Sequence, residues 1–417
     1  MKTSIPSKCI YFIFSLLLIL SINVSAQNTN FFSGKILDKS NSNPLHLATL
    51  NVVDSNISTV TNKEGEFNLK LPKTKSYKLL QISFLGYQPL EIELSSLKTS
   101  NNTIYLKQAA TQLDVVELSR TKNAKDLVLQ MLKLKNENYI DKSTVMTSFY
   151  RETIKKNNKN ASLSEAVLKI QKTPYTTSKQ DLITIVKARK KTNYSKLDTL
   201  ALKLRGGPYS ALHTDLIKYP DFIFTDNSYD NYNFTFDKST TINGKAIYVI
   251  NFKQKENIAD VLYYGKLYID ATTNALTKAD YSLNLDNPDK ASELFISKKP
   301  SKAKVLPTRA NYLVNFSSSN GKWHYAYSNI SLNFKVKWKS QWFGKKYSLQ
   351  SEMAITDWEF NNTFKIANKE KLKSSSIFEE KANGFLDDKF WGTYNIIEPE
   401  KSIENAIKKI NKQLKKS

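Results

Sequence analysis

The sequence is poor in the residue types on which much enzyme chemistry depends. Its 417 residues include one cysteine, Cys9, three histidines, 11 glycines and 11 prolines. So few glycines and prolines argue against collagen-like, linker-like and glycine-rich phosphate-binding designs. Cys9 lies in a segment that we expect to be removed. The remaining chain would then have no disulfide, no thiol nucleophile and no thiolate metal site.

Familiar catalytic motifs are also missing. The sequence contains no Gly-x-Ser-x-Gly elbow, no Gly-x-x-x-x-Gly-Lys phosphate loop, no Gly-x-Gly-x-x-Gly turn and no His-Glu-x-x-His pair. Neighbouring acids such as Asp387 and Asp388 are expected to point apart. We therefore predict no catalytic, cofactor-binding or metal-binding residue and no cofactor. Two alternatives stay open: a three-histidine site assembled across domains, and a glycosidase, which needs just two suitably placed carboxylates. The histidines are His46, His213 and His324.

The N-terminus has the layout of a secretory signal. Lys2 and Lys8 give a positive start, residues 10–20 are almost wholly apolar, and small residues lead to Ala26. We predict a signal peptide over 1–26, cleaved after Ala26. A membrane anchor is the alternative, but the apolar run is shorter than the roughly 20 residues that span a bilayer. No later run is long and apolar enough for a transmembrane segment. We expect a soluble exported protein, periplasmic or associated with an outer membrane.

Residues 31–107 alternate apolar and polar positions in short runs separated by turns. The runs 32–38, 48–53, 60–69, 79–85 and 90–94 contribute to at least six strands. About 75 residues organised in this way predict a small β-sandwich.

Four motifs in this region resemble a known family. They are GKILD at 34–38, PLHLAT at 44–49, TNKEGEF at 61–67 and SFLGY at 83–87. Together they resemble the carboxypeptidase-regulatory-like domain, a transthyretin-type sandwich frequent on exported and outer-membrane proteins of Bacteroidetes. The resemblance implies such a domain over 27–118. It does not imply peptidase activity, because in carboxypeptidases this module carries none of the catalytic residues.

The remainder, 119–417, is predicted to be a second, β-rich domain with a few amphipathic helices. Apolar residues at helical spacing predict a helix near 121–137, followed by a strand at 144–153 and a mixed region to about 221. Residues 231–360 are strongly strand-like and include a hairpin over 265–285. Many successive antiparallel strands predict a large curved sheet or an open half-barrel. The hairpin is similar to one in lipoprotein-carrier folds, which implies a concave apolar face that holds an acyl chain.

The C-terminal tail combines an aromatic segment with a predicted helix near 400–416. Ile403, Ile407, Ile410 and Leu414 form one apolar stripe, with acids before it and lysines at its end, as the helix dipole favours. The tail and the FYRE run at 149–152 resemble uncharacterised exported Bacteroidetes proteins that carry the same N-terminal module. This second resemblance implies no known activity.

The net charge of +24 is concentrated in the second domain. Residues 155–203 hold twelve Lys or Arg against three acids, and residues 298–346 hold eleven against none. Strand alternation puts every second residue of 335–339 on one face, about 7 Å apart. The candidate contacts for an anionic envelope surface are Lys335, Lys337, Lys339, Trp342, Lys345 and Lys346.

Nucleic-acid binding and edge protection are two further roles that a basic surface can have. Nucleic acid is not expected as a partner, because the chain has an export signal and no nucleic-acid motif. A lysine-rich solvated face that keeps strand edges from pairing stays open. Taken together, the sequence predicts a non-catalytic envelope binding or scaffolding protein whose partner is an envelope protein or an anionic surface. The alternatives are a carrier of lipid or acyl chains and an envelope peptide or glycan hydrolase.

Overall fold

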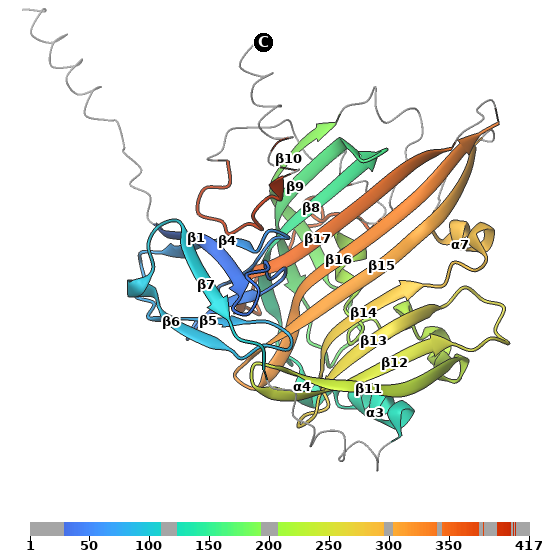
Figure 1. Ribbon diagram of the computed structural model, residues 1–417, viewed down its shortest axis with the longest axis horizontal. Coiled ribbons are helices and arrows are strands. Elements are labelled where there is room, and N and C mark those ends of the chain that lie inside the picture. Colours follow the sequence, from blue (N-terminus) through green and yellow to red (C-terminus); the bar gives the residue numbers. More distant parts are fainter. Residues whose placement is uncertain are drawn as a thin grey trace, which may run out of the picture.

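The computed structural model describes residues 29–109, 123–192, 207–295, 303–339, 344–374, 378, 390–401, 403 and 405. The predicted signal peptide, its cleavage site Ala26 and the candidate contact Trp342 lie outside these residues. The fold class predicted from sequence is confirmed: the protein is mainly β, with a small N-terminal sandwich beside a large open antiparallel sheet. Figure 1 shows the sandwich in blue against the long strands of the sheet, coloured green to orange.

The sandwich consists of two small sheets, with strand orders β4-β1-β7 and β3-β2-β5-β6. Within β4 every second side chain is buried, as alternation requires of a strand with one face on a core. The core includes Ile36, Leu50, Leu69 and Leu80, all fully buried. The elements are β1 (Thr29–Asp38), β2 (Thr49–Val52), β3 (Ser58–Val60), β4 (Glu66–Pro72), β5 (Leu79–Ser83), β6 (Leu90–Glu93), the short 3-10 helix η1 (Leu94–Ser96) and β7 (Asn102–Leu106).

The turn between β3 and β4 depends on a glycine. Gly65 has φ +71°, and a Cβ there would lie 2.6 Å from the carbonyl oxygen of Ile36. The Asn62 side chain accepts a hydrogen bond from the backbone N–H of Glu66 and closes the turn. Both the backbone angle and the close approach require the residue without a side chain.

The large sheet has the strand order β10-β9-β8-β17-β16-β15-β14-β13-β12-β11 and is antiparallel throughout. Pairing of β8 with β17 brings the start of this region beside its end. The sheet is not closed, so β10 and β11 are its edges. The strands are β8 (Thr144–Lys156), β9 (Lys159–Lys172), β10 (Leu182–Thr192), β11 (Tyr232–Ile242), β12 (Lys245–Gln254), β13 (Tyr263–Asp270), β14 (Leu276–Leu283), β15 (Ala303–Ser319), β16 (Lys322–Trp338) and β17 (Lys345–Phe360).

One face of this sheet, here called the inner face, packs against the helices. Leu127, Val128 and Met131 of α3 enter the same core as Tyr150 and Tyr325 of the sheet. The helical spacing of these apolar residues predicted one helix near 121–137. The structure has two helices there, α3 and α4. The helical elements are α3 (Ala124–Lys133), α4 (Lys135–Asn138), α6 (Pro208–Leu212), η2 (Pro220–Phe222), η3 (Thr225–Asn231) and α7 (Pro288–Phe295).

The opposite face, the outer face, carries the sandwich and the segment 390–400. Val60 of the sandwich packs with Phe149, Tyr327 and Trp391 in a small apolar cluster. The side chain of Asn56 donates to the carbonyl of Trp358 at 2.7 Å. Segment 390–400 therefore lies between the sandwich and the sheet and contacts both. Its polar contacts with the sandwich include those of Asn395 with Lys70 and of Glu398 with Asn68.

Two long strands lie where the sequence indicated only a mixed region. In β9, residues 161–168 are all buried, because the strand packs on both faces. A strand covered on both sides lacks the polar alternation from which we identified the others. Of the predicted helix near 400–416, residues 401, 403 and 405 are helical, and the rest lies outside the described residues.

Candidate functional site

A cavity of about 290 Å³ lies on the inner face, beneath α6, η2 and α7. Side chains of β13, β15, β16 and β17 form its floor. Its described lining includes no charged side chain, and its polar groups include the hydroxyls of Ser210 and Ser351. The principal lining residues are Phe222, Tyr263, Phe295, Tyr312, Ile330 and Leu332. An aromatic and aliphatic wall of this kind suits a neutral, apolar ligand group.

Aromatic packing fixes the cavity wall. Phe222 meets Tyr312 edge to face with ring centroids 5.6 Å apart, and Tyr281 stacks on Tyr312 at 5.2 Å. Burial raises the pKa of Tyr281 well above its usual value, so its hydroxyl remains protonated. Within the described part of the chain, that buried hydroxyl has no hydrogen-bond partner. Tyr281 therefore keeps an unused donor directly behind the cavity wall.

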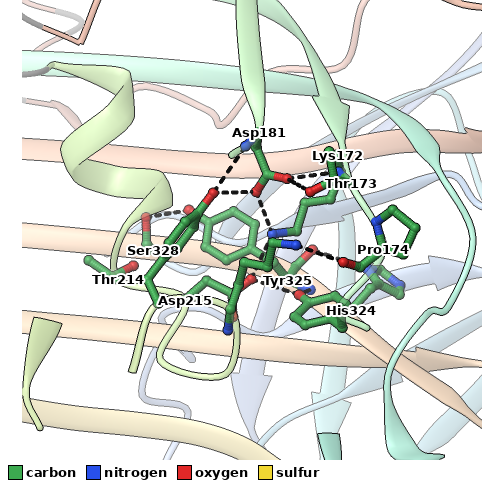
Figure 2. A network of polar contacts seen from close by, with 12 residues as sticks. Lys172, Thr173, Pro174, Asp181, Thr214, Asp215, His324, Tyr325 and Ser328 are labelled. Atoms are coloured by element: carbon green, nitrogen blue, oxygen red, sulfur yellow. Dashed lines mark hydrogen bonds and ion pairs between the residues drawn. The ribbon is translucent and has the colours of Figure 1, made fainter. Parts of the chain in front are cut away.

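A second site on the inner face is a buried cluster of charges, shown in Figure 2. Lys172 ends β9, Asp181 precedes β10 and Asp215 follows α6. The Lys172 ammonium contacts the carboxylate of Asp181 at 2.8 Å and that of Asp215 at 2.9 Å. All three side chains are almost completely inaccessible. Burial alone would lower the pKa of Lys172, but the two carboxylates raise it, so the lysine is charged.

Hydrogen bonds occupy the carboxylate oxygens of this cluster. Asp181 accepts from the backbone and hydroxyl of Thr173 and from the Tyr219 hydroxyl. Asp215 accepts from the Tyr175 hydroxyl at 2.7 Å and from the backbone N–H of Lys218. The tyrosine hydroxyls thus replace hydrogen bonds that water would make to both carboxylates if they were exposed.

This arrangement bears on the hydrolase alternative. Two facing carboxylates are present, but the ammonium of Lys172 lies between Asp181 and Asp215. Each of the four carboxylate oxygens already accepts a hydrogen bond, and both side chains are inaccessible to solvent. A general acid or base must reach the reacting group. The cluster instead joins the loop after α6 to the ends of β9 and β10.

The three histidines do not form a catalytic set. Burial lowers the pKa of His46 and of His324 to about 4, and it also lowers that of His213, so the rings are neutral at pH 7. His213 packs on the ring of Tyr219, and the charge of Lys172 also lowers the pKa of His213 and His324. Within the described residues, no three histidines or carboxylates are placed to hold a metal ion.

A further buried charge cluster lies on the outer face. Arg151 of β8 donates to Glu165 of β9 at 2.7 Å, to Glu352 of β17 at 3.0 Å and to the carbonyl of Ile397 at 2.8 Å. Arg189 of β10 makes a second ion pair with Glu165. Four strands and segment 390–400 are thus tied together by charge.

The six candidate contacts of the sequence are distributed as follows. Lys335 and Lys337 are exposed on the outer face of β16, and Lys339 is exposed directly after the strand ends at Trp338. Lys346 of β17 lies directly opposite Lys335 and is also exposed, whereas Lys345 lies opposite the buried Val336 and faces the other way. Trp342 is outside the described residues.

Sequence reasoning missed Lys172, Asp181, Asp215 and Arg151. Lys172, Asp181 and Asp215 lie in no motif, and Arg151 was noted only as part of the FYRE run at 149–152, without a role. The partners are separated by up to 201 positions, from Arg151 to Glu352. The usable signal was a charged residue within an otherwise apolar strand, as at Arg151, which follows Phe149 and Tyr150. Such a residue has to be paired when it is buried.

Comparison with known proteins identifies one domain. Residues 32–118 match the model of the CarboxypepD_reg-like domain. No curated protein matches the chain. Within the described residues, no helix combines the length and apolar character needed to cross a membrane.

Among solved structures, similarity is distant. A DUF1329 family protein from Desulfovibrio piger is 12% identical, with 58% of this chain and 93% of that chain covered and a TM-score of 0.22. A putative membrane-associated protein of unknown function from Bacteroides fragilis is 11% identical, with 79% and 98% covered and a TM-score of 0.15. A 9R-lipoxygenase from Cyanothece is 11% identical, with 40% and 42% covered and a TM-score of 0.15.

Proposed function

We propose that this chain is an exported, non-catalytic binding protein of the cell envelope that holds a small apolar group in the inner-face cavity. The observation that carries the proposal is the aromatic cavity itself, with its uncharged described lining. Burial of apolar surface gives roughly 25 cal/mol per Å², so a short acyl chain or a ring gains affinity there without any ionic contact.

The size of the cavity limits the ligand. About 290 Å³ is at the lower end of the range for small-molecule sites, roughly 300–1,000 Å³. Residues of α3 and α6 pack on other parts of the inner face. The proposed ligand is therefore a short acyl chain or a single ring system, and not a complete lipid with two long chains.

Export is supported by a sequence prediction and by the domain match. The predicted signal peptide ends at Ala26, and residues 32–118 match the CarboxypepD_reg-like domain, a module typical of secreted proteins. That module is itself non-catalytic. In this proposal it docks the protein in the periplasm or at an outer membrane, while the large sheet supplies the ligand site.

Octanoate is a suitable probe, and isothermal titration with the chain beginning at Gln27 measures its binding. Ile330→Phe should fill the cavity and reduce affinity at least tenfold, because the added ring occupies the ligand volume. Leu129→Phe adds a similar ring on the exposed side of α3 and should leave affinity unchanged, since Leu129 is 37% exposed.

A second variant keeps the test valid if Ile330→Phe does not fold. Leu332→Ala enlarges the same cavity and should shift the preference from octanoate towards a longer acyl chain. Native mass spectrometry of protein purified from its own envelope should show a bound mass that is lost on denaturation. Octanoate binding that is equal in wild type, Ile330→Phe and Leu332→Ala would refute the proposal.

A further inference from the structure

The outer face of the sheet carries a plane of cations at one end of its three longest strands. The ends of β15, β16 and β17 project beyond the other strands in Figure 1. The register puts Lys337 opposite Lys304 of β15, and Lys335 opposite Lys346 of β17. We call this surface the cationic face. It consists of Lys304, Lys335, Lys337, Lys339 and Lys346, all exposed.

Strand geometry sets the spacing of these charges. Neighbouring strands are about 4.8 Å apart, and alternate residues along one strand are about 7 Å apart. Like charges placed directly opposite each other in a sheet are destabilising. The pairs Lys337–Lys304 and Lys335–Lys346 therefore cost stability in the isolated protein, and an external anion would relieve that cost.

Compensating acids are scarce on this face. Lys304 pairs with Asp289 of α7 at 3.0 Å. The next outward positions along the strands are neutral or basic: Arg309 and Asn311 in β15, Ser331 and Asn333 in β16, and Ser348 and Gln350 in β17. Among the described residues, the ion pair of Lys304 with Asp289 is therefore the only one on the cationic face, which carries an excess of positive charge.

The strand register argues against edge protection by Lys335. Lysines can prevent edge-to-edge pairing only if they lie on an exposed edge. β16 lies in the middle of the ten-stranded sheet, and at Lys335 it is paired with both β15 and β17. Lys335 therefore does not protect an edge, whereas Lys337 and Lys339 lie beyond Val336, the last residue of β16 that pairs with β17.

We propose that the cationic face docks the protein on the anionic headgroups of a lipid bilayer. Charge complementarity favours this partner, because a plane of lysines matches a plane of negative headgroups and requires no cleft. The proposal does not depend on a ligand in the inner-face cavity, which lies on the opposite face of the sheet.

Vesicle cosedimentation tests the proposal. The chain beginning at Gln27 contains every described residue and lacks the apolar segment of the predicted signal peptide. Vesicles of phosphatidylglycerol with phosphatidylcholine are compared with vesicles of phosphatidylcholine alone. We expect binding to the anionic vesicles at low salt and release as salt rises and shortens the screening length.

Two triple variants distinguish this face from net charge. The first variant combines Lys335→Gln, Lys337→Gln and Lys346→Gln. It should bind on the order of 100-fold more weakly at low salt, because each lysine near an anionic surface contributes roughly fivefold to affinity. The matched control changes three exposed lysines of the sandwich, Lys39, Lys98 and Lys107, to Gln and should stay within about twofold of wild type, since they lie away from the face.

Three outcomes would contradict the bilayer proposal. Equal binding to neutral vesicles would show that charge is not the attraction. An equal loss in the sandwich control would show that only net charge matters. Binding to soluble polyphosphate without binding to anionic vesicles would exclude the bilayer as the partner. Octanoate is itself an anion, so the cavity proposal is tested by the differences among wild type, Ile330→Phe and Leu332→Ala, which all retain these lysines. Failure of the vesicle test would leave those differences, and the cavity proposal, intact.

Discussion

Replacing Lys172 by Met tests whether the inner-face charge cluster holds the sheet and its helices together. Asp181 and Asp215 are fully buried and share the single ammonium of Lys172. Removing it leaves two buried carboxylates without a counter-ion, and breaking a buried pair in this way costs about 3–5 kcal/mol. We expect a loss of that size in the free energy of unfolding at pH 7.

The chain offers a matched control in Lys266, which pairs with Asp237 at 2.6 Å on the surface. Lys266 and Asp237 are 47% and 32% exposed, so solvent screens them, and Lys266→Met should cost about 0–1 kcal/mol. Adding Asp181→Asn and Asp215→Asn to Lys172→Met should restore part of the lost stability, because no uncompensated charge then remains.

The cost of Lys172→Met should also depend on pH. Burial raises the pKa of Asp181, but Lys172 and its hydrogen bonds hold it below the usual value. In wild type this carboxylate therefore stabilises the fold above its unfolded pKa, and the stabilisation is lost as pH falls. In the variant the pKa rises above the unfolded value, so protonation restores stability as pH falls. The difference between the two proteins should therefore shrink from pH 7 towards pH 4.

Urea unfolding followed by tryptophan fluorescence is the appropriate assay. All five tryptophans lie at position 323 or later, so the signal reports the large sheet and segment 390–400 and not the sandwich. The free energies follow from linear extrapolation. The reasoning would be refuted if Lys172→Met cost no more than Lys266→Met, or if its cost were the same at pH 7 and pH 4.

Three other substitutions test separate features. Arg151→Met leaves Glu165 without one of its two arginine partners and Glu352 without its arginine partner, and should cost about 3–5 kcal/mol by the same assay, against little change for an exposed arginine such as Arg309. Gly65→Ala combines a positive φ with a backbone clash and should destabilise the sandwich by about 1–3 kcal/mol, visible as faster amide exchange in β4 and not in β16. Burial lowers the pKa of His324 from 6.5 to about 4, so the unfolded state binds the proton first as pH falls. This ring should account for about 2 kcal/mol of the stability that wild type loses between pH 7 and pH 5. His324→Gln should lose less by that amount, and an equal loss would contradict this role.

Most of the sandwich and the hairpins could be predicted from local sequence patterns. In β4 the alternation of apolar residues is visible in the sequence because one face is buried and the other is not. The turn residues around Gly65 are equally local. In β9, burial of both faces erased the alternation, and the strand was not predicted. Burial on both faces does not always conceal a strand, since β8 is buried along 144–154 and was predicted at 144–153.

By itself, the sequence determined the β-rich class, the sandwich and the alternation of lysines along residues 335–339, because these depend on neighbours a few positions apart. Tertiary structure alone decided which distant charges meet. It paired Arg151 with Glu352 across β8 and β17, and placed Lys172 between Asp181 and Asp215. Strand order also put β16 in the middle of the sheet. Such pairings arise from strand register and loop closure over long separations, which no local periodicity encodes.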